Sequence, residues 1–209
     1  NLSVEVRSGG WDAGVGRPVH RLRGSVVGIV GFGRIGRAVA KRAKSFGLEI
    51  IVHDPYLSEK SFPAGLAPKL VSFEQLLETS DFVSVHTPLT SDTRHLIGES
   101  ELQTMKKSAF LVNTCRGPVI DEYALARALA DGELAGAGID VLEGEPPPGD
   151  HPIRSAPNAI ITPHTAFYSE ESLEELQRRT AQCAVDALEG RIPENVYNKE
   201  VLADTGLKG

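Results

Sequence analysis

The sequence predicts an α/β fold built on a doubly wound, mostly parallel sheet. From residue 25 onward, short apolar runs rich in β-branched residues alternate with helical runs, which is the pattern of βαβ units. A glycine-rich turn joins the first apolar run to the first helical run. The 209 residues, of which 41% are hydrophobic and 24% charged, are enough to bury a sizeable core.

Each element of this alternation is predicted from its own pattern. The expected strands cover residues 25–30, 49–53, 81–86, 109–113, 137–141 and 159–162. The expected helices cover residues 34–46, 72–79, 121–130 and 169–188, the last with an amphipathic pattern. Gly47 and Gly190 are placed to end the first and last helices, and Ser72 with Gln75 forms a capping-box pair.

Composition and the length of the apolar runs argue against several classes of function. With 28 acidic and 22 basic residues and a net charge of −6, the chain is not expected to bind nucleic acid directly. The longest apolar runs are strand-sized, so no membrane span is predicted. Two cysteines and no signal peptide favour a cytoplasmic protein. The first residue is Asn1, from which we expect a piece of a longer protein.

The glycine-rich turn has the sequence Gly31-Phe32-Gly33-Arg34-Ile35-Gly36 and lies between a predicted strand and a predicted helix. Gly31 would allow the tight turn, Gly33 the close approach of a pyrophosphate, and Gly36 the packing of helix on sheet. A purely structural glycine turn is the alternative, but the placement favours a phosphate-binding loop. We therefore interpret residues 24–190 as a dinucleotide-binding domain, 1–23 as an entry arm and 191–209 as a tail.

Asp54 ends the second predicted strand about twenty residues after the glycines. Its carboxylate can accept hydrogen bonds from the adenosine ribose and repel a 2′-phosphate, so NAD is favoured over NADP. The alternative is that Asp54 only caps the turn made with Pro55. His53 is expected to point to the other face of the strand.

Several further segments resemble one family of enzymes. They are residues 113–117 (Asn-Thr-Cys-Arg-Gly), 140–146 (Asp-Val-Leu-Glu-Gly-Glu-Pro), 162–164 (Thr-Pro-His) and 85–89 (Val-His-Thr-Pro-Leu). From about residue 11 to 198, the chain resembles the NAD-binding (Rossmann) domain of the D-isomer-specific 2-hydroxyacid dehydrogenases. Residues 164–170 and 190–193 look most like the C-terminal-binding-protein branch, although Phe167 stands where that branch usually has Trp.

The resemblance implies catalytic roles for three residues. Arg116 would anchor the substrate, His164 would act as the acid/base, and Glu145 would be its carboxylate partner. Residue chemistry is consistent with these roles, since Arg offers a charged planar fork, His transfers protons near neutral pH, and a carboxylate stabilises the imidazolium. Each follows a separate predicted strand, and ligands bind outside the carboxyl ends of such strands.

The resemblance also implies an NAD cofactor, a small 2-hydroxy or 2-oxo acid substrate, a homodimer formed through this domain, and a substrate domain absent from this chain. Asp140 would hold the nicotinamide carboxamide, and His86 would line the adenine side. The remaining histidines, His20, His95 and His151, are interpreted as loop or helix-end residues, and no metal site is predicted. The predicted cofactor-binding residues are Gly31, Phe32, Gly33, Arg34, Ile35, Gly36, Asp54, His86, Thr87, Pro88, Thr93, Thr114, Cys115, Arg116, Asp140, His164 and Ala166.

Two functions remain open from the sequence. One is a dehydrogenase that transfers a hydride between NAD(H) and a D-2-hydroxy acid. The other is an NAD-sensing, dimeric interaction module of the corepressor kind that keeps the dehydrogenase site. The presence together of Arg116, Glu145 and His164 favours the enzyme.

Overall fold

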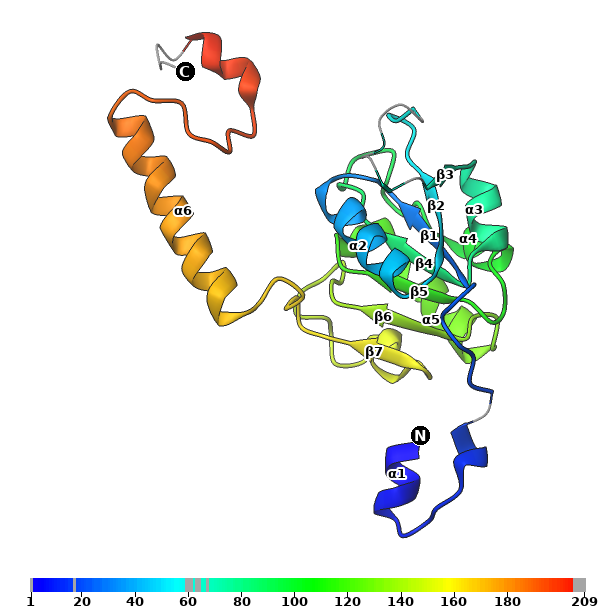
Figure 1. Ribbon diagram of the computed structural model, residues 1–209. Helices are drawn as coiled ribbons and strands as arrows, with labels where there is room; N and C mark the ends of the chain where they lie inside the picture. The colour runs from blue at the N-terminus through cyan, green and yellow to red at the C-terminus, as the bar shows by residue number, and fades with distance from the viewer. Residues whose placement is uncertain (1, 17, 59–61, 63–64, 67, 205–209) are drawn as a thin grey trace. The chain divides into compact units, whose positions relative to one another are not determined.

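The computed structural model describes residues 2–16, 18–58, 62, 65–66 and 68–204. Within these residues, seven strands form one parallel sheet in the order β3-β2-β1-β4-β5-β6-β7 (Figure 1). The predicted doubly wound parallel sheet is therefore confirmed. The strands are β1 (Val26–Val30), β2 (Glu49–His53), β3 (Lys69–Leu70), β4 (Phe82–Val85), β5 (Phe110–Asn113), β6 (Gly136–Ile139) and β7 (Ala159–Ile161).

The strand order reverses direction beside β1, which has β2 on one side and β4 on the other. The register pairs the last residue of β1, Val30, with His53 of β2 and with Val85 of β4. Asn113 of β5 likewise pairs with Val85 and with Ile139 of β6. The strands thus end at a common level, and the loops that follow them lie together at the carboxyl ends of the strands.

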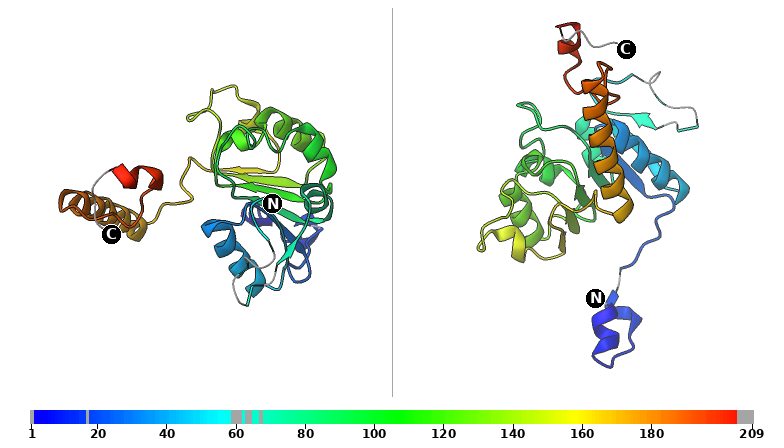
Figure 2. Two further views of the ribbon diagram at one scale, coloured as in Figure 1. Left: turned by 90° about the horizontal axis from the view of Figure 1, so that it is seen from above. Right: turned by 90° about the vertical axis from the view of Figure 1, so that its left-hand side faces the viewer.

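Helices cover both faces of the sheet (Figure 2). Helix α2 (Arg34–Ser45) packs on β1 and β2, where Ala40 and Val52 belong to one hydrophobic core. The second core contains Leu76, Leu102 and Leu125. These three come in turn from α3 (Phe73–Thr79), α4 (Glu99–Thr104) and α5 (Glu122–Ala130).

Caps are found at the predicted helix boundaries, although of the predicted Ser72–Gln75 capping box the described contacts include only the bond to Ser72 Oγ. Gly47 follows α2 with φ +79°, a left-handed conformation that glycine adopts without a Cβ penalty. Ser72 Oγ accepts the amide of Gln75 at 3.1 Å and caps α3. Asp121 caps α5 by accepting the amides of Tyr123 and Ala124, each at 3.0 Å.

Some elements were not predicted, because they are short and carry little periodic pattern. Strand β3 has two residues, and α4 buries one side chain, that of Leu102. The predicted entry arm contains α1 (Leu2–Arg7) and the 3₁₀-helix η1 (Ala13–Gly16). Further 3₁₀-helices are η3 (Gly117–Val119), η4 (Pro152–Ser155) and η5 (Lys199–Asp204).

The chain divides into two compact units, Asn1–His164 and Thr165–Gly209. The second unit contains the predicted last helix, α6 (Glu170–Leu188), which Ser169 caps and which Gly190 follows at φ +76°. The domain boundaries expected after residues 23 and 190 remain predictions. Among the described residues, no helix is long and apolar enough to span a membrane.

Candidate active site

The glycine-rich turn after β1 shows why each glycine is needed. Gly31 has φ +87°, and a Cβ there would lie 2.9 Å from the backbone of His86. A Cβ on Gly36 would lie 2.4 Å from the carbonyl oxygen of Gly31. Gly33 differs, because a Cβ there would meet no atom of the described residues within 4 Å. The fold therefore requires Gly31 and Gly36, whereas the space beside Gly33 is open for a ligand.

The turn presents the start of α2 to this open space. The amides of Arg34, Ile35 and Gly36 belong to the first helical turn and have no carbonyl partner within the helix. Together with the helix dipole, such amides form an anion site. Phe32 contributes its backbone alone, since its ring is 1% exposed and packs edge-to-face on Phe62.

Asp54 both caps its own turn and supports the glycine-rich turn. One carboxylate oxygen accepts the amide of Tyr56 at 3.0 Å, and the other accepts the amide of Phe32 at 2.8 Å. Both readings of Asp54 thus have a structural basis, because the capping residue also lines a cavity shared with Gly31 and Gly33.

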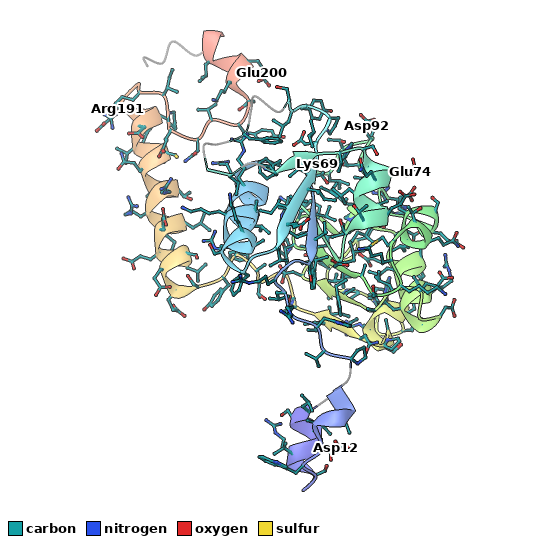
Figure 3. The ribbon with its side chains drawn as sticks, turned by 45° about the vertical axis from the view of Figure 1, so that its right-hand side comes forward. Asp12, Lys69, Glu74, Asp92, Arg191 and Glu200 are labelled. Atoms are coloured by element: carbon teal, nitrogen blue, oxygen red, sulfur yellow. The ribbon has the colours of Figure 1, made fainter. Side chains whose placement is uncertain are left out.

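This cavity, which we call the β1–β4 cavity, has a volume of about 460 Å³. His53 also contributes to the lining. Its Nδ1 lies 3.2 Å from the carbonyl of Val71, and its ring packs against Phe73, which belongs with the core that contains Leu76. These contacts agree with the expectation that His53 and Asp54 point to different faces of the strand. Asp92, labelled in Figure 3, contributes from the loop after β4. The lining residues are Val30, Gly31, Gly33, His53, Asp54, Pro55, Tyr56, His86, Thr87, Pro88, Thr90, Asp92, Thr93 and Leu96.

One polar atom in the wall of the β1–β4 cavity is unsatisfied. Thr87 Oγ1 is buried and has no hydrogen-bond partner among the described residues. Such a group is costly unless a ligand or water completes it. Beside it, burial lowers the pKa of His86, whose Nε2 lies 2.9 Å from Ser84 Oγ, so His86 is neutral at pH 7.

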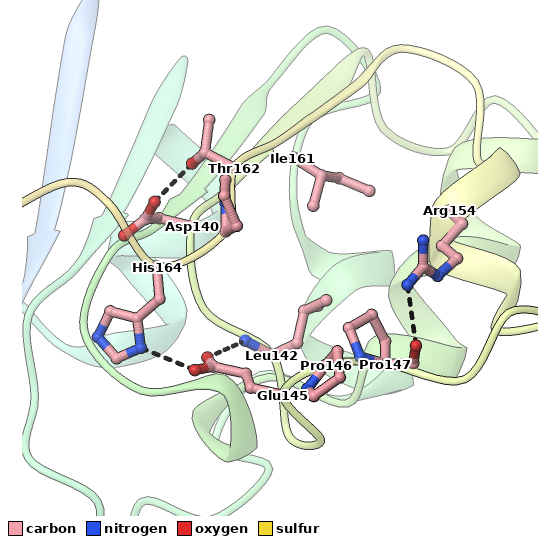
Figure 4. Close-up of a pocket in the computed structure, with 10 residues that line it drawn as sticks. Asp140, Leu142, Glu145, Pro146, Pro147, Arg154, Ile161, Thr162 and His164 are labelled. Carbon is pink, nitrogen blue, oxygen red and sulfur yellow. Dashed lines mark hydrogen bonds and ion pairs between the residues drawn. The ribbon is translucent and has the colours of Figure 1, made fainter.

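A second cavity, the β6–β7 cavity, has a volume of about 380 Å³ and lies at the ends of β6 and β7 (Figure 4). Predicted residues Asp140, Glu145 and His164 line it together, although they come from two different loops. The full lining is Asp140, Leu142, Glu145, Pro146, Pro147, Arg154, Ile161, Thr162, Pro163 and His164.

Glu145 and His164 form a hydrogen-bonded pair in this cavity, with 2.8 Å between Oε2 and Nδ1 (Figure 4). The other oxygen, Oε1, accepts the amide of Leu142 at 2.9 Å. The bond from His164, and then that from Leu142, lowers the pKa of Glu145. Because an ionised carboxylate only accepts hydrogen bonds, the proton of the pair sits on Nδ1.

The backbone of His164 is held in an uncommon conformation. Its φ is +54°, in the left-handed region that non-glycine residues rarely adopt. The His164 amide donates to the carbonyl of Asp140 at 2.8 Å and to that of Thr162 at 3.0 Å. The Asp140 side chain in turn accepts the hydroxyl of Thr162 at 2.5 Å. Such strain persists where the surroundings over-determine it, and it is concentrated at functional sites.

Arg116 lies on the loop after β5, which a buried asparagine shapes. Asn113, 1% exposed, donates from Nδ2 to the Arg116 carbonyl at 2.9 Å and accepts the Cys115 amide at 3.0 Å. A Cβ on Gly117 would lie 2.0 Å from the Leu142 carbonyl carbon, so this loop packs directly against the loop that carries Glu145. Sequence reasoning missed the role of Asn113, which a polar residue ending an apolar strand could have signalled.

The predicted site residues thus fall into groups. Gly31, Gly33, Asp54, His86, Thr87, Pro88 and Thr93 line the β1–β4 cavity, and Asp140, Glu145 and His164 line the β6–β7 cavity. Thr114, Cys115 and Arg116 line neither cavity in the described part of the chain. The partly buried Cys115 thiol, whose pKa burial raises, contacts the Thr87 backbone. Ala166 belongs to the second unit, and its predicted role remains a prediction.

Comparisons with known proteins give matches over most of the chain. Residues 1–166 match the family described as D-isomer specific 2-hydroxyacid dehydrogenase, NAD binding domain. The glyoxylate reductase of Korarchaeum cryptofilum (strain OPF8) is 44% identical over 201 residues, covering 94% of this chain and 60% of that protein.

Two solved structures support the same relationship. The D-lactate dehydrogenase of Lactobacillus jensenii with NAD⁺ has a TM-score of 0.84 at 25% identity, over 94% of this chain and 62% of that one. The D-lactate dehydrogenase of Aquifex aeolicus, complexed with NAD and lactic acid, has a TM-score of 0.83 at 30% identity, over 90% and 61%. The chain therefore spans about 60% of the length of the relatives it matches.

The comparisons do not support every prediction made from the sequence. The relatives named here are reductases and dehydrogenases, and the resemblance to the C-terminal-binding-protein branch is not confirmed. The alternative of an NAD-sensing interaction module receives no support from them. The assignment of individual site residues is tested by none of these matches and remains a prediction.

Proposed function

Because this chain belongs to the D-isomer-specific 2-hydroxyacid dehydrogenases as their NAD-binding domain, we propose that it carries the cofactor site and the acid/base group of such an enzyme. The reaction is the interconversion of a D-2-hydroxy acid and a 2-oxo acid. The observation that carries the proposal is the His164–Glu145 pair, 2.8 Å apart, at the edge of the sheet that also holds the glycine-rich turn.

The residues of the β1–β4 cavity fit NAD(H). The open space at Gly33 and the free amides of α2 suit a pyrophosphate, and the orphaned Thr87 hydroxyl needs a polar partner. Asp54, already fixed by the Phe32 amide, has lone pairs left for ribose hydroxyls and would repel a 2′-phosphate. When bound, NAD(H) supplies the hydride chemistry.

In this proposal His164 moves the proton of the substrate hydroxyl at Nε2. Glu145 holds the opposite ring nitrogen, fixes the tautomer and stabilises the imidazolium when the ring is protonated. Asp140 holds the nicotinamide carboxamide while its backbone carbonyl restrains His164.

Arg116 binds the carboxylate of the substrate. Its guanidinium contacts the carbonyl of Cys115 through one nitrogen, Nη1, at 2.5 Å, and its remaining donors are sufficient for a forked contact. The Asn113 and Gly117 contacts described above hold its backbone beside the loop of Glu145.

The test uses the full-length protein, NADH and a panel of 2-oxo acids that begins with glyoxylate and pyruvate. We expect NADH-dependent reduction of at least one acid, weaker use of NADPH, and a loss of roughly 10²- to 10⁴-fold in kcat for His164→Ala. NADH affinity of His164→Ala should stay near that of the unmodified protein. Absence of turnover with every acid, or full activity of His164→Ala, would refute the proposal.

Three further features belong to the same proposal. The enzyme is a homodimer formed through this domain, it resides in the cytoplasm, and it has no nucleic-acid or membrane partner. Sedimentation of the full-length protein at micromolar concentration tests the dimer. Substrate identity within the 2-oxo acids is left to the panel, since the relatives named above act on different acids.

A further inference from the structure

The central part of the loop that carries Glu145 has no amides with which to anchor itself. Residues 146–148 are three consecutive prolines, which have no N–H to donate. A loop of this kind must be held by its ends and by its carbonyl groups. Arg154 supplies the carbonyl contacts, donating to Pro147 and Pro148 at 2.9 Å each.

The two ends of the loop meet at one buried carboxylate. Glu122, in the first turn of α5, is 5% exposed. Its Oε1 accepts the amide of Glu143 at 2.5 Å, at the start of the loop. Its Oε2 lies 3.4 Å from Nε2 of His151, at the end of the loop.

His151 is oriented so that its proton faces this carboxylate. The ring is 8% exposed and packs on Tyr123 with 4.7 Å between ring centroids. Nδ1 accepts the amide of Ile153 at 3.3 Å and so caps η4. Because Nδ1 is the acceptor, the neutral ring carries its proton on Nε2, next to Glu122.

Burying this pair is energetically costly, and neither member lines the cavities described above. Burial also raises the pKa of Glu122. What the pair does is to fix the backbone at Glu143, next to the Leu142 amide that donates to Oε1 of Glu145. A fixed Leu142 amide aims the other oxygen of Glu145 at His164.

We propose that Glu122 and His151 are positioning residues that hold the Glu145 carboxylate on Nδ1 of His164. This inference rests on the proposed function for its catalytic consequence, whereas the structural consequence can be measured separately. Neither residue touches the substrate or cofactor, and both act through the loop that carries Glu145.

The sharpest variant is His151→Asn. Asparagine is a good helix cap, so it can still accept the Ile153 amide, but it is too short to reach Glu122. Glu122→Gln is the companion variant, which keeps an acceptor for the Glu143 amide and removes the charge. Glu99→Gln is the control. Glu99 pairs at 3.3 Å, on the surface, with Arg127, which lies in α5 as Glu122 does.

In the full-length protein, we expect His151→Asn and Glu122→Gln to lower kcat by about 10- to 100-fold, since small misplacements of a catalytic group are costly. The pH profile should move in the direction that Glu145→Gln moves it, while NADH affinity is unchanged. In a Glu145→Gln background, His151→Asn should have less than about a threefold further effect, because interacting residues are non-additive. Glu99→Gln should match the unmodified protein.

A second readout does not depend on turnover. The ring-nitrogen NMR signals of His164 report whether Nδ1 is hydrogen-bonded, and we expect them to shift in His151→Asn and not in Glu99→Gln. If the unmodified protein reduces no 2-oxo acid, the proposed function fails and this NMR comparison still decides the positioning role. Unchanged His164 signals in His151→Asn, or kinetic losses that simply add to those of Glu145→Gln, would overturn the inference.

Discussion

Nδ1 of His164 lies 2.8 Å from Oε2 of Glu145, and this contact joins the loops that follow β7 and β6. Both side chains remain partly accessible, with 45% and 39% of their surface exposed, so the pair can reach a ligand and exchange protons with solvent. The remaining Glu145 oxygen is occupied by the Leu142 amide. The carboxylate is thereby held on one nitrogen of the imidazole, Nδ1. Its chemical effect should be visible in the pH dependence of the reaction.

Glu145→Gln is expected to leave a working enzyme with a shifted pH profile. A neutral amide stabilises the imidazolium less than a carboxylate does. Oxidation of the hydroxy acid requires the unprotonated ring, and the acidic limb of kcat/KM should therefore move to lower pH. The measurement is a kcat/KM profile between about pH 5 and 9, with NAD affinity as the control. An unmoved acidic limb would contradict the assigned role of Glu145.

Gly33→Ala and Gly31→Ala should fail in different ways. At Gly33, with φ −74°, the methyl group enters open space, so stability should change by less than about 1 kcal/mol while NADH affinity falls at least tenfold. At Gly31, a left-handed φ and a contact 2.9 Å from the His86 backbone should destabilise the fold by about 1–2 kcal/mol or more. Urea unfolding and NADH titration of both variants provide the comparison. A Gly33→Ala protein with normal affinity would show that no phosphate approaches this glycine.

Asp54→Asn is expected to separate cofactor selectivity from support of the glycine-rich turn. The amide oxygen can still accept the Phe32 amide, so the turn should be preserved, but the negative charge facing a 2′-phosphate is lost. We expect weaker NADH binding and a smaller preference over NADPH, measured by titration of both. Asp54→Ala should in addition lower the melting temperature. Equal affinities of the unmodified protein for NADH and NADPH would contradict the ribose assignment.

The sheet and the clustering of Asp140, Glu145 and His164 could be predicted because they depend on local patterns. Apolar strands of similar length in a parallel sheet end at one edge, so polar residues placed just after each strand converge there. The residues that refine the site could not be predicted in the same way. Glu122 and His151 meet only through the folding of a proline-rich loop, and nothing in their local sequence distinguishes them from a helix-start glutamate and a loop histidine.

His53 and Asp54 show what the alternation along a strand can predict. Alternation along β2 places neighbouring side chains on opposite faces. The His53 ring packs on Phe73, which belongs with the core that contains Leu76, whereas Asp54 accepts the amide of Phe32, a member of the other core. Arg116 could not be placed in this way, since its position depends on the contact between Gly117 and Leu142 from two separate loops.

Arg116→Lys should be far from conservative. A lysine ammonium is a point charge and cannot make two parallel N–H···O contacts to a carboxylate, which the planar guanidinium can. We expect kcat/KM for the acid substrate to fall by more than about tenfold, with NADH affinity nearly unchanged. The matched control is Arg127→Lys, whose guanidinium forms an exposed pair with Glu99. Normal kcat/KM in Arg116→Lys would mean that another group binds the substrate carboxylate.

The last prediction concerns stability at the amino ends of the strands, where Asp81 precedes β4. Its Oδ2 accepts the amide of Val26 at 2.8 Å, and its Oδ1 lies 2.8 Å from Nζ of Lys106. Although burial acts to raise the pKa of Asp81, the bonds from Lys106 and Val26 outweigh it, and the pKa is lowered. A carboxyl group whose pKa is lower in the folded state stabilises the fold above its unfolded pKa, near 3.9, and this contribution is lost as the pH falls through the folded value.

Asp81→Asn should therefore reduce the free energy of unfolding at pH 7 by about 1 kcal/mol, a modest figure because solvent screens both partners. The difference from the unmodified protein should shrink as the pH falls below about 4, since protonation then removes the same charge from Asp81. Urea unfolding at pH 7 and pH 3 measures this, and Glu99→Gln, which breaks an exposed pair, should change stability by less than about 0.5 kcal/mol. NADH affinity should be unaffected, because Asp81 lies at the strand ends away from the glycine-rich turn. A stability difference that is constant between pH 7 and pH 3 would show that the charge of Asp81 contributes nothing, and that any effect of the substitution arises from altered packing.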